Sequence, residues 1–226
     1  MYPTAIFSAA VLAFSSLARA ADLSLTTQLQ LADGPERYSL LPSDEDFIFD
    51  FNKSDTGLAD RRSFPALVGT NAAMALAELP GCSMVATHIH PRSSELFAVV
   101  SGRVFTESVP EAGVFDSDGN PRVIRSELGP LQMTVFHQGA FHTQMNPDCE
   151  PALAVASFSS EDPGAGIIVP QLLSLSDDVV VNSFNGAISA DELDKIREAI
   201  PEGMAIQLDE CRAKCGARDD DYSEEE

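Results

Sequence analysis

The sequence predicts an all-β domain, a barrel or sandwich of short strands with helices near its end. Between residues 71 and 159, apolar residues alternate in short runs that Pro and Gly residues separate. Removing a predicted leader of 20 residues from the 226 leaves 206, a length that fits one large all-β domain. Helical spacing of apolar residues is clear only after residue 189.

The first 20 residues resemble a secretory signal peptide. Residues 5–17 form an apolar run too short to span a bilayer, and Ala18-Arg19-Ala20 offers small residues at the positions before a cleavage site. We therefore expect a signal peptide over residues 1–20 and a soluble, secreted, extracellular mature protein.

The elements then follow in order. Residues 23–46 lack strong periodicity and predict an extended arm, and residues 47–51 alternate as a strand. Asn52, Lys53 and Ser54 form an N-glycosylation sequon in the loop that follows. Further strands are predicted over residues 71–79, 84–90, 96–107, 122–128, 133–136, 141–145 and 153–159.

The C-terminal part is predicted to be helical. Ser189 and Glu192 form a capping box, and apolar residues then recur at helical spacing until Pro201. A second helix is expected over residues 205–215, ending at Gly216. One domain over residues 21–215 and an acidic disordered tail over residues 216–226 complete the prediction.

The charge of the chain excludes two classes of partner. Its formal net charge is −21. Nucleic acid and anionic membranes require clusters of Lys and Arg that this chain lacks. We expect no nucleic-acid partner and no membrane partner.

Three histidines and one glutamate have the spacing of a metal site. His88 and His90 alternate in a predicted strand and so share one face, Glu95 lies beyond the turn at Pro91, and His142 comes from another strand. The fourth histidine, His137, lies an odd number of residues from His142 and is expected in a turn or on the surface. Taken singly, each histidine would more often be a hydrogen-bonded structural residue than a ligand. The composite pattern favours a metal site.

The same residues resemble the two motifs of the germin-like branch of the cupin family. The first motif covers residues 81–102, GCSMVATHIHPRSSELFAVVSG, and the second is HQGAFHTQMN, with Gly139, His142 and Asn146 at the matching positions. His137 stands where the family has proline, and the spacer after Gly81 holds one extra residue. The resemblance implies a cupin jelly-roll barrel with C-terminal α-helices, a metal held by His88, His90, Glu95 and His142, and Asn146 steadying the ligands from behind.

The resemblance also implies a disulfide. In the cupin barrel the strands that carry His88 and His142 are antiparallel. The residue numbers of two positions paired across these strands therefore add to a nearly constant sum. The residue numbers of Cys82 and Cys149 add to 231, between the 230 of His88 with His142 and the 232 of His90 with His142, and we expect the two cysteines to be bonded. Cys211 and Cys215, four residues apart on a predicted helix, are left either bonded to each other or as free or intermolecular thiols.

Two classes of function fit this resemblance. Germin-like proteins bind manganese and include oxalate oxidases and superoxide dismutases, which implies Mn²⁺, with Fe²⁺ or Zn²⁺ as alternatives, and a small anion or superoxide as ligand. The positions matching the substrate-holding asparagines of oxalate-oxidising germins carry Met74 and Val85, which favours another small anion, superoxide or no turnover. The alternative is a non-catalytic, metal-stabilised wall or matrix protein of the spherulin kind. In germins such terminal helices clasp neighbouring subunits, so the resemblance implies a homo-oligomer; the alternative is a helix pair packed on its own barrel.

Overall fold

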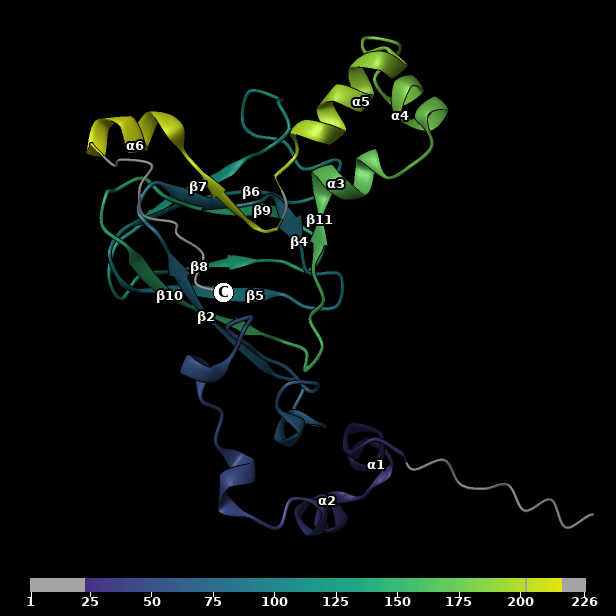
Figure 1. Cartoon of the computed structure of the whole chain (residues 1–226), viewed down its shortest axis with the longest axis vertical. Coiled ribbons are helices and arrows are strands. Elements are labelled where there is room, and N and C mark those ends of the chain that lie inside the picture. Colours follow the sequence, from purple (N-terminus) through teal and green to yellow (C-terminus); the bar gives the residue numbers. More distant parts are fainter. Residues whose placement is uncertain (1–22, 202, 217–226) are drawn as a thin grey trace, which may run out of the picture.

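Two antiparallel β-sheets face each other and form the barrel. We describe a computed structural model, in which residues 23–201 and 203–216 are defined (Figure 1). The first sheet has the strand order β1-β2-β10-β5-β8. Its strands are β1 (Leu58–Ala59), β2 (Ala73–Leu79), β10 (Ala152–Phe158), β5 (Glu95–Ser101) and β8 (Met133–Phe136).

The second sheet has seven strands and carries His88, His142 and Asn146 of the two motifs. Its main path is β11-β4-β9-β3-β12, and β6 pairs with both β9 and β7. These strands are β11 (Gly166–Ile167), β4 (His88–Ile89), β9 (Phe141–Asn146), β3 (Ser83–Val85), β12 (Ala205–Gln207), β6 (Val104–Val109) and β7 (Ile124–Leu128). The cupin jelly roll expected from the motifs is confirmed.

Alternation along the strands places the core between the two sheets. Buried residues alternate with more exposed ones in β10 and β6, as expected for strands with one face on a core. The core combines alanines with larger side chains, which are Leu79, Phe97, Val99, Val104, Leu128, Phe136 and Phe158. Gly102 makes the turn between β5 and β6, with φ of 78°. A Cβ there would lie 2.7 Å from the Cβ of Ala152, so only glycine fits.

The N-terminal arm is helical, and the prediction of an extended arm was wrong. It contains α1 (Leu25–Leu31) and α2 (Gly34–Leu40), followed by short 3-10 turns at Asp44–Phe47, Phe51–Lys53 and Pro65–Leu67. Local capping explains the helices: Ser24 caps α1, and Asp33 forms a capping box with Glu36 at α2. The strand predicted over residues 47–51 is also absent, because its ends belong to two of those 3-10 turns.

The C-terminal helices lie on the other side of the barrel (Figure 1). Helices α3 (Ile168–Leu173), α4 (Asp177–Ser183) and α5 (Ala190–Ala199) enclose their own small core of Leu173, Val180 and Leu193. The predicted capping box of Ser189 and Glu192 is confirmed at the start of α5. The helix predicted over residues 205–215 is instead strand β12 followed by α6 (Asp209–Cys215), which ends at Gly216 in the left-handed conformation.

The predicted disulfide between Cys82 and Cys149 is wrong. Cys82 is bonded to Cys211 and Cys149 to Cys215, so both bonds fasten α6 to the barrel. The strand register explains the error: the paired positions sum to 230 at His88 and His142 but to 229 at Ser83 and Asn146. At a sum of 229 the position opposite Cys82 is Pro147 and not Cys149, and the Cys82 N–H donates to the carbonyl of the next residue, Asp148.

Two predictions lie outside the described residues, those of a signal peptide over residues 1–20 and of a disordered tail beyond Gly216. None of the helices in the described part of the chain has the length and apolar character needed to cross a bilayer. Asn52 is exposed within the 3-10 turn Phe51–Lys53, and its side chain donates to Asp50 Oδ1 at 3.1 Å. Its glycosylation remains a prediction.

Candidate metal centre

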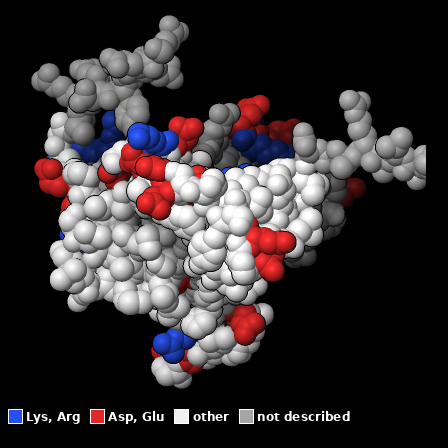
Figure 2. All heavy atoms as spheres, turned by 90° about the horizontal axis from the view of Figure 1, so that it is seen from below, with Lys and Arg blue, Asp and Glu red and all other residues white. Residues whose placement is uncertain are grey.

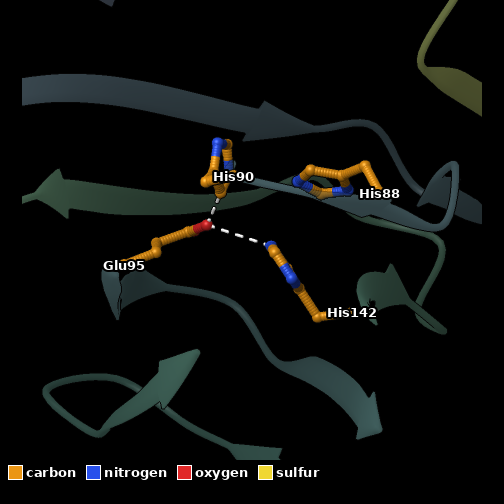
Figure 3. Close-up of side chains that lie close together, drawn as sticks. All are labelled: His88, His90, Glu95 and His142. Atoms are coloured by element: carbon orange, nitrogen blue, oxygen red, sulfur yellow. Dashed lines mark hydrogen bonds and ion pairs between the residues drawn. The ribbon is translucent and has the colours of Figure 1, made fainter. Parts of the chain in front are cut away.

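The four predicted ligands converge between the two sheets (Figure 3). His88, in β4, lies directly opposite His142, in β9. His90 follows in the turn after β4, and Glu95 opens β5 in the facing sheet. One donor atom of each residue lies within 4.8 Å of the corresponding atoms of the other three.

Backbone carbonyls fix the tautomer of all three imidazoles. The Nδ1 atoms of His88, His90 and His142 lie 2.9, 2.6 and 2.8 Å from the carbonyl oxygens of Ala86, Gly164 and Ala140. A carbonyl oxygen only accepts hydrogen bonds, so each Nδ1 must carry the proton. In the neutral rings the Nε2 lone pairs are then available to a metal, and the carbonyls orient the rings from behind.

The carboxylate completes the donor set. Glu95 Oε2 lies 2.9 Å from His90 Nε2 and 3.2 Å from His142 Nε2. All four residues are buried, with 2–8% of their surface exposed. A buried cluster of three nitrogen donors and one oxygen donor fits a divalent transition metal, whose charge one carboxylate only partly balances.

Both shifted pKa values favour the ligand forms of these groups. Burial, together with the neighbouring His142, lowers the pKa of His88 to about 4, so that this ring is neutral at pH 7. Burial opposes ionisation of Glu95, but the neighbouring His142 and His90, whose Nε2 atoms face its Oε2, outweigh burial and lower the pKa of Glu95 to about 2. Glu95 is therefore a carboxylate and His88 a neutral imidazole over the physiological range.

Two phenylalanines wall the site. The ring of Phe136 stacks on His142 with centroids 4.2 Å apart, and Phe158 meets His90 edge-on at 4.7 Å. Phe136 and Phe158 are also the residues paired with Glu95 on the two neighbouring strands. This apolar surround holds the imidazoles in place and keeps the local dielectric low.

An ionic clamp supports His90 from outside. The carbonyl that orients His90 belongs to Gly164, in the segment leading to β11. Two residues earlier, Asp162 accepts from Arg92 at 2.7 Å and from Arg61 at 2.9 Å. Arg92 also donates to the Asp162 carbonyl, and its own N–H donates to the carbonyl of Pro163. The clamp thus holds the carbonyl-bearing segment against the turn that carries His90.

Gln144 is a site residue that the sequence reasoning missed. It is buried two positions after His142 on β9, so both side chains point into the barrel. Its Nε2 lies 3.5 Å from Glu95 Oε1, and its Oε1 is a buried acceptor without a hydrogen-bond partner. The alternation of β9 was the signal that could have found it.

Asn146 does not have the expected role behind the ligands. Its Nδ2 donates to the carbonyls of Leu79, Pro80 and Glu150, and its Oδ1 accepts from the Asp148 N–H. These bonds use the whole amide to close the turn after β9.

The match of Met74 to a substrate-holding asparagine of oxalate-oxidising germins also fails. Met74 is 44% exposed on the outer face of its sheet, whereas Val85, the other matched position, packs against the core. His137 is exposed in a turn, as expected.

A jelly roll with three histidines and one glutamate between its sheets defines the chain as a cupin. The Cupin_1 family (Cupin) matches residues 40–191, and the chain belongs to this family. Among solved structures, an oxalate oxidase in complex with the substrate analogue glycolate superposes with a TM-score of 0.59 at 18% identity, covering 71% of this chain and 84% of that chain. This likeness supports the fold.

Curated relatives place the chain within the family. Spherulin-1A of Physarum polycephalum is 33% identical over 203 residues, which is 84% of this chain and 79% of that protein. A germin-like protein of Arabidopsis thaliana, subfamily 2 member 3, is 30% identical over 118 residues, covering 50% of this chain and 49% of that protein. The germin-like and spherulin-like resemblance of the motifs is confirmed.

Proposed function

We propose that this chain is a secreted cupin that binds one manganese ion through His88, His90, Glu95 and His142 and acts as an oxidoreductase on a small anion or superoxide. The observation that supports it most is the common orientation of the three imidazoles. Each Nδ1 is tied to a backbone carbonyl, which leaves each Nε2 for the ion.

The donor set favours manganese or iron over a structural zinc. Four protein ligands leave two positions free on an octahedral ion, whereas a structural zinc site is closed by four ligands in a tetrahedron. A bound manganese ion would supply Lewis acidity and one-electron chemistry to a small ligand that reaches it. Fe²⁺ and Zn²⁺ are the alternative ions.

The residues of the chain would have distinct roles in such a reaction. Glu95 offsets the positive charge and, with its low pKa, stays ionised. Gln144 places an amide within 3.5 Å of Glu95, where it can hold the carboxylate or meet a ligand beside it. Phe136 and Phe158 restrict the space around His142 and His90, which favours small ligands.

The second candidate is a non-catalytic, metal-stabilised protein of the extracellular wall or matrix. The likeness to Spherulin-1A over 84% of the chain favours it. Either function fits secretion: disulfides persist in oxidising compartments, and this chain has two.

Turnover separates the two candidates. Manganese-loaded protein would be assayed with oxalate and with superoxide, and its manganese resonance spectrum recorded with and without azide. An oxidoreductase shows turnover that azide inhibits, together with a spectral change as azide reaches the ion. A loaded protein that shows neither supports the wall or matrix function. The His142→Ala variant is the control for activity from free metal.

We also propose that the chain forms a homo-oligomer through the outer face of its five-stranded sheet. The exposed apolar side chains on this face include Met74, Leu96 and Val135. Leu96 pairs with Val135 on one side and with Ser157 on the other, and Ser157 pairs with Met74, so the three lie on neighbouring strands or one strand apart. The side of the molecule seen in Figure 2 has broad areas without charged residues. In a chain of charge −21, two such faces meet without bringing like charges together. Light scattering of wild type and Leu96→Glu tests this: the variant should be smaller in mass, and equal masses would contradict it.

A further inference from the structure

The sulfur atoms of all four cysteines form one cluster. The Sγ atoms of Cys82, Cys211 and Cys215 lie within 4.8 Å of one another, and Cys149 is bonded to Cys215. The two disulfides are in contact, since Cys82 Sγ and Cys215 Sγ are only 3.4 Å apart. Two bonds that merely fastened α6 to the barrel would not need to touch.

The three segments that carry the cysteines are also held together by backbone bonds. The N–H of Cys82 donates to the Asp148 carbonyl at 2.8 Å, and the Leu208 N–H donates to the Cys82 carbonyl at 2.8 Å. Strand β12, which leads into α6, pairs with β3 from Ser83 to Val85. Gly81 allows the closest approach, because a Cβ there would lie 1.9 Å from the Cys149 carbonyl oxygen. This framework does not depend on the disulfides.

The sulfur positions are close to those of a tetrahedral thiolate site. A Zn–S bond is about 2.3 Å, which separates neighbouring sulfurs by roughly 3.8 Å. The contact between Cys82 and Cys215 is already near that value, and rotations of the side chains would bring the bonded pairs to it. Cys211 and Cys215 share one side of α6 through their spacing of four residues. Cys82 is buried, whereas Cys149 is exposed and gives access from solvent.

We propose that the reduced form of this cluster binds one soft d¹⁰ cation, of the Zn²⁺ or Cd²⁺ class, through the thiolates of Cys82, Cys149, Cys211 and Cys215. Reduction gives each disulfide two electrons and two protons, which yields four thiols, and binding of the cation releases the four thiol protons. The disulfides are the oxidised state of the same site. Thiolates select such cations, whereas the histidines and glutamate of the barrel suit manganese, so one chain would hold two sites of different selectivity.

Cadmium titration of the reduced protein tests the proposal. The whole protein would be reduced with a phosphine without oxygen, freed of reductant and titrated with Cd²⁺, while ultraviolet absorption follows cadmium–thiolate bonds. The expected result is one thiolate-bound Cd²⁺ per chain, displaced by Zn²⁺, and no such absorption from the oxidised protein. The variant Cys211→Ser should lose the tetrathiolate spectrum of bound Co²⁺. The variant His142→Ala should keep it, because the barrel histidines contribute no sulfur.

Two results would overturn the proposal. One is a reduced protein that keeps its far-ultraviolet circular dichroism but shows no cadmium–thiolate absorption. The other is a Cys211→Ser variant whose cobalt spectrum equals that of the wild type. If reduction unfolds the chain, refolding with Zn²⁺ and without oxidant must give folded protein with a zinc ion that Cys211→Ser loses. Failure to do so also overturns the proposal.

Discussion

His88 and His142 lie directly opposite each other on the antiparallel strands β4 and β9, with ring centroids 4.2 Å apart. Two imidazoles in such contact repel each other when both are charged, and both are buried. This arrangement favours neutral rings, which is also the form that binds a metal.

Acid should therefore destabilise the metal-free protein through His88. Its pKa is about 4 in the folded chain and 6.5 unperturbed, so the unfolded state binds more protons between these values. The contribution of His88 is fully present above pH 6.5 and is lost as the pH falls towards 4. Thermal melts from pH 7 to pH 4 should show a fall that is smaller in His88→Gln. Equal falls in the two proteins would contradict this assignment.

The clamp at Asp162 should tune metal affinity without touching the metal. Replacing Asp162 with Asn removes the charge that Arg61 and Arg92 share, and so loosens the segment whose Gly164 carbonyl orients His90. Loss of such outer support typically costs about 10- to 100-fold in metal affinity. Competition with a chelator measures it. Asp118→Asn, the same change in an exposed loop, should bind metal like the wild type, and an equal loss in both variants would refute the role of the clamp.

Gln144 should matter to the site more than to the stability of the fold. Its Oε1 is buried without a partner, and such an acceptor costs about 1–3 kcal/mol relative to a satisfied one. Gln144→Met keeps the length of the side chain and removes the acceptor that has no partner, so the melting temperature should stay unchanged or rise. The manganese resonance spectrum should change, because Glu95 loses its amide neighbour. A large drop in stability with an unchanged spectrum would instead make Gln144 a structural residue.

The disulfide pairing makes a separate prediction about stability. Replacing both cysteines of one disulfide with Ala should lower the free energy of unfolding, because the bond no longer restricts the unfolded chain. The loss is up to about 5 kcal/mol for Cys82–Cys211, which closes a loop of 129 residues, and up to about 4 kcal/mol for Cys149–Cys215, which closes one of 66. Proteolysis of the unreduced protein followed by mass spectrometry should find these two linkages. A peptide that joins Cys82 to Cys149 would contradict the structure.

The motif residues allowed the fold and the candidate ligands to be predicted well. Spacing and the resemblance to the germin motifs together predicted that His88, His90, Glu95 and His142 meet: period-two alternation puts His88 and His90 on one face, and the resemblance implied the strand pairing that brings in His142. The partner of Cys82 was misassigned, because a one-residue change in the sum of paired residue numbers between β3 and β9 lies beyond any pattern in the chain. Asn146 was misassigned because it ends β9, four residues after His142, where its amide bonds the turn that follows. The arm was misassigned because two short capped helices around Ser24 and Asp33 show little apolar periodicity.

The metal content of the purified protein, measured by elemental mass spectrometry after washing with chelator, tests the central claim most directly. His142→Ala should be measured beside the wild type, because without His142 the remaining ligands all come from residues 88–95 and cannot enclose an ion. The account predicts about one manganese per chain in the wild type and almost none in the variant. Equal metal in both proteins, or none in the wild type, would contradict it.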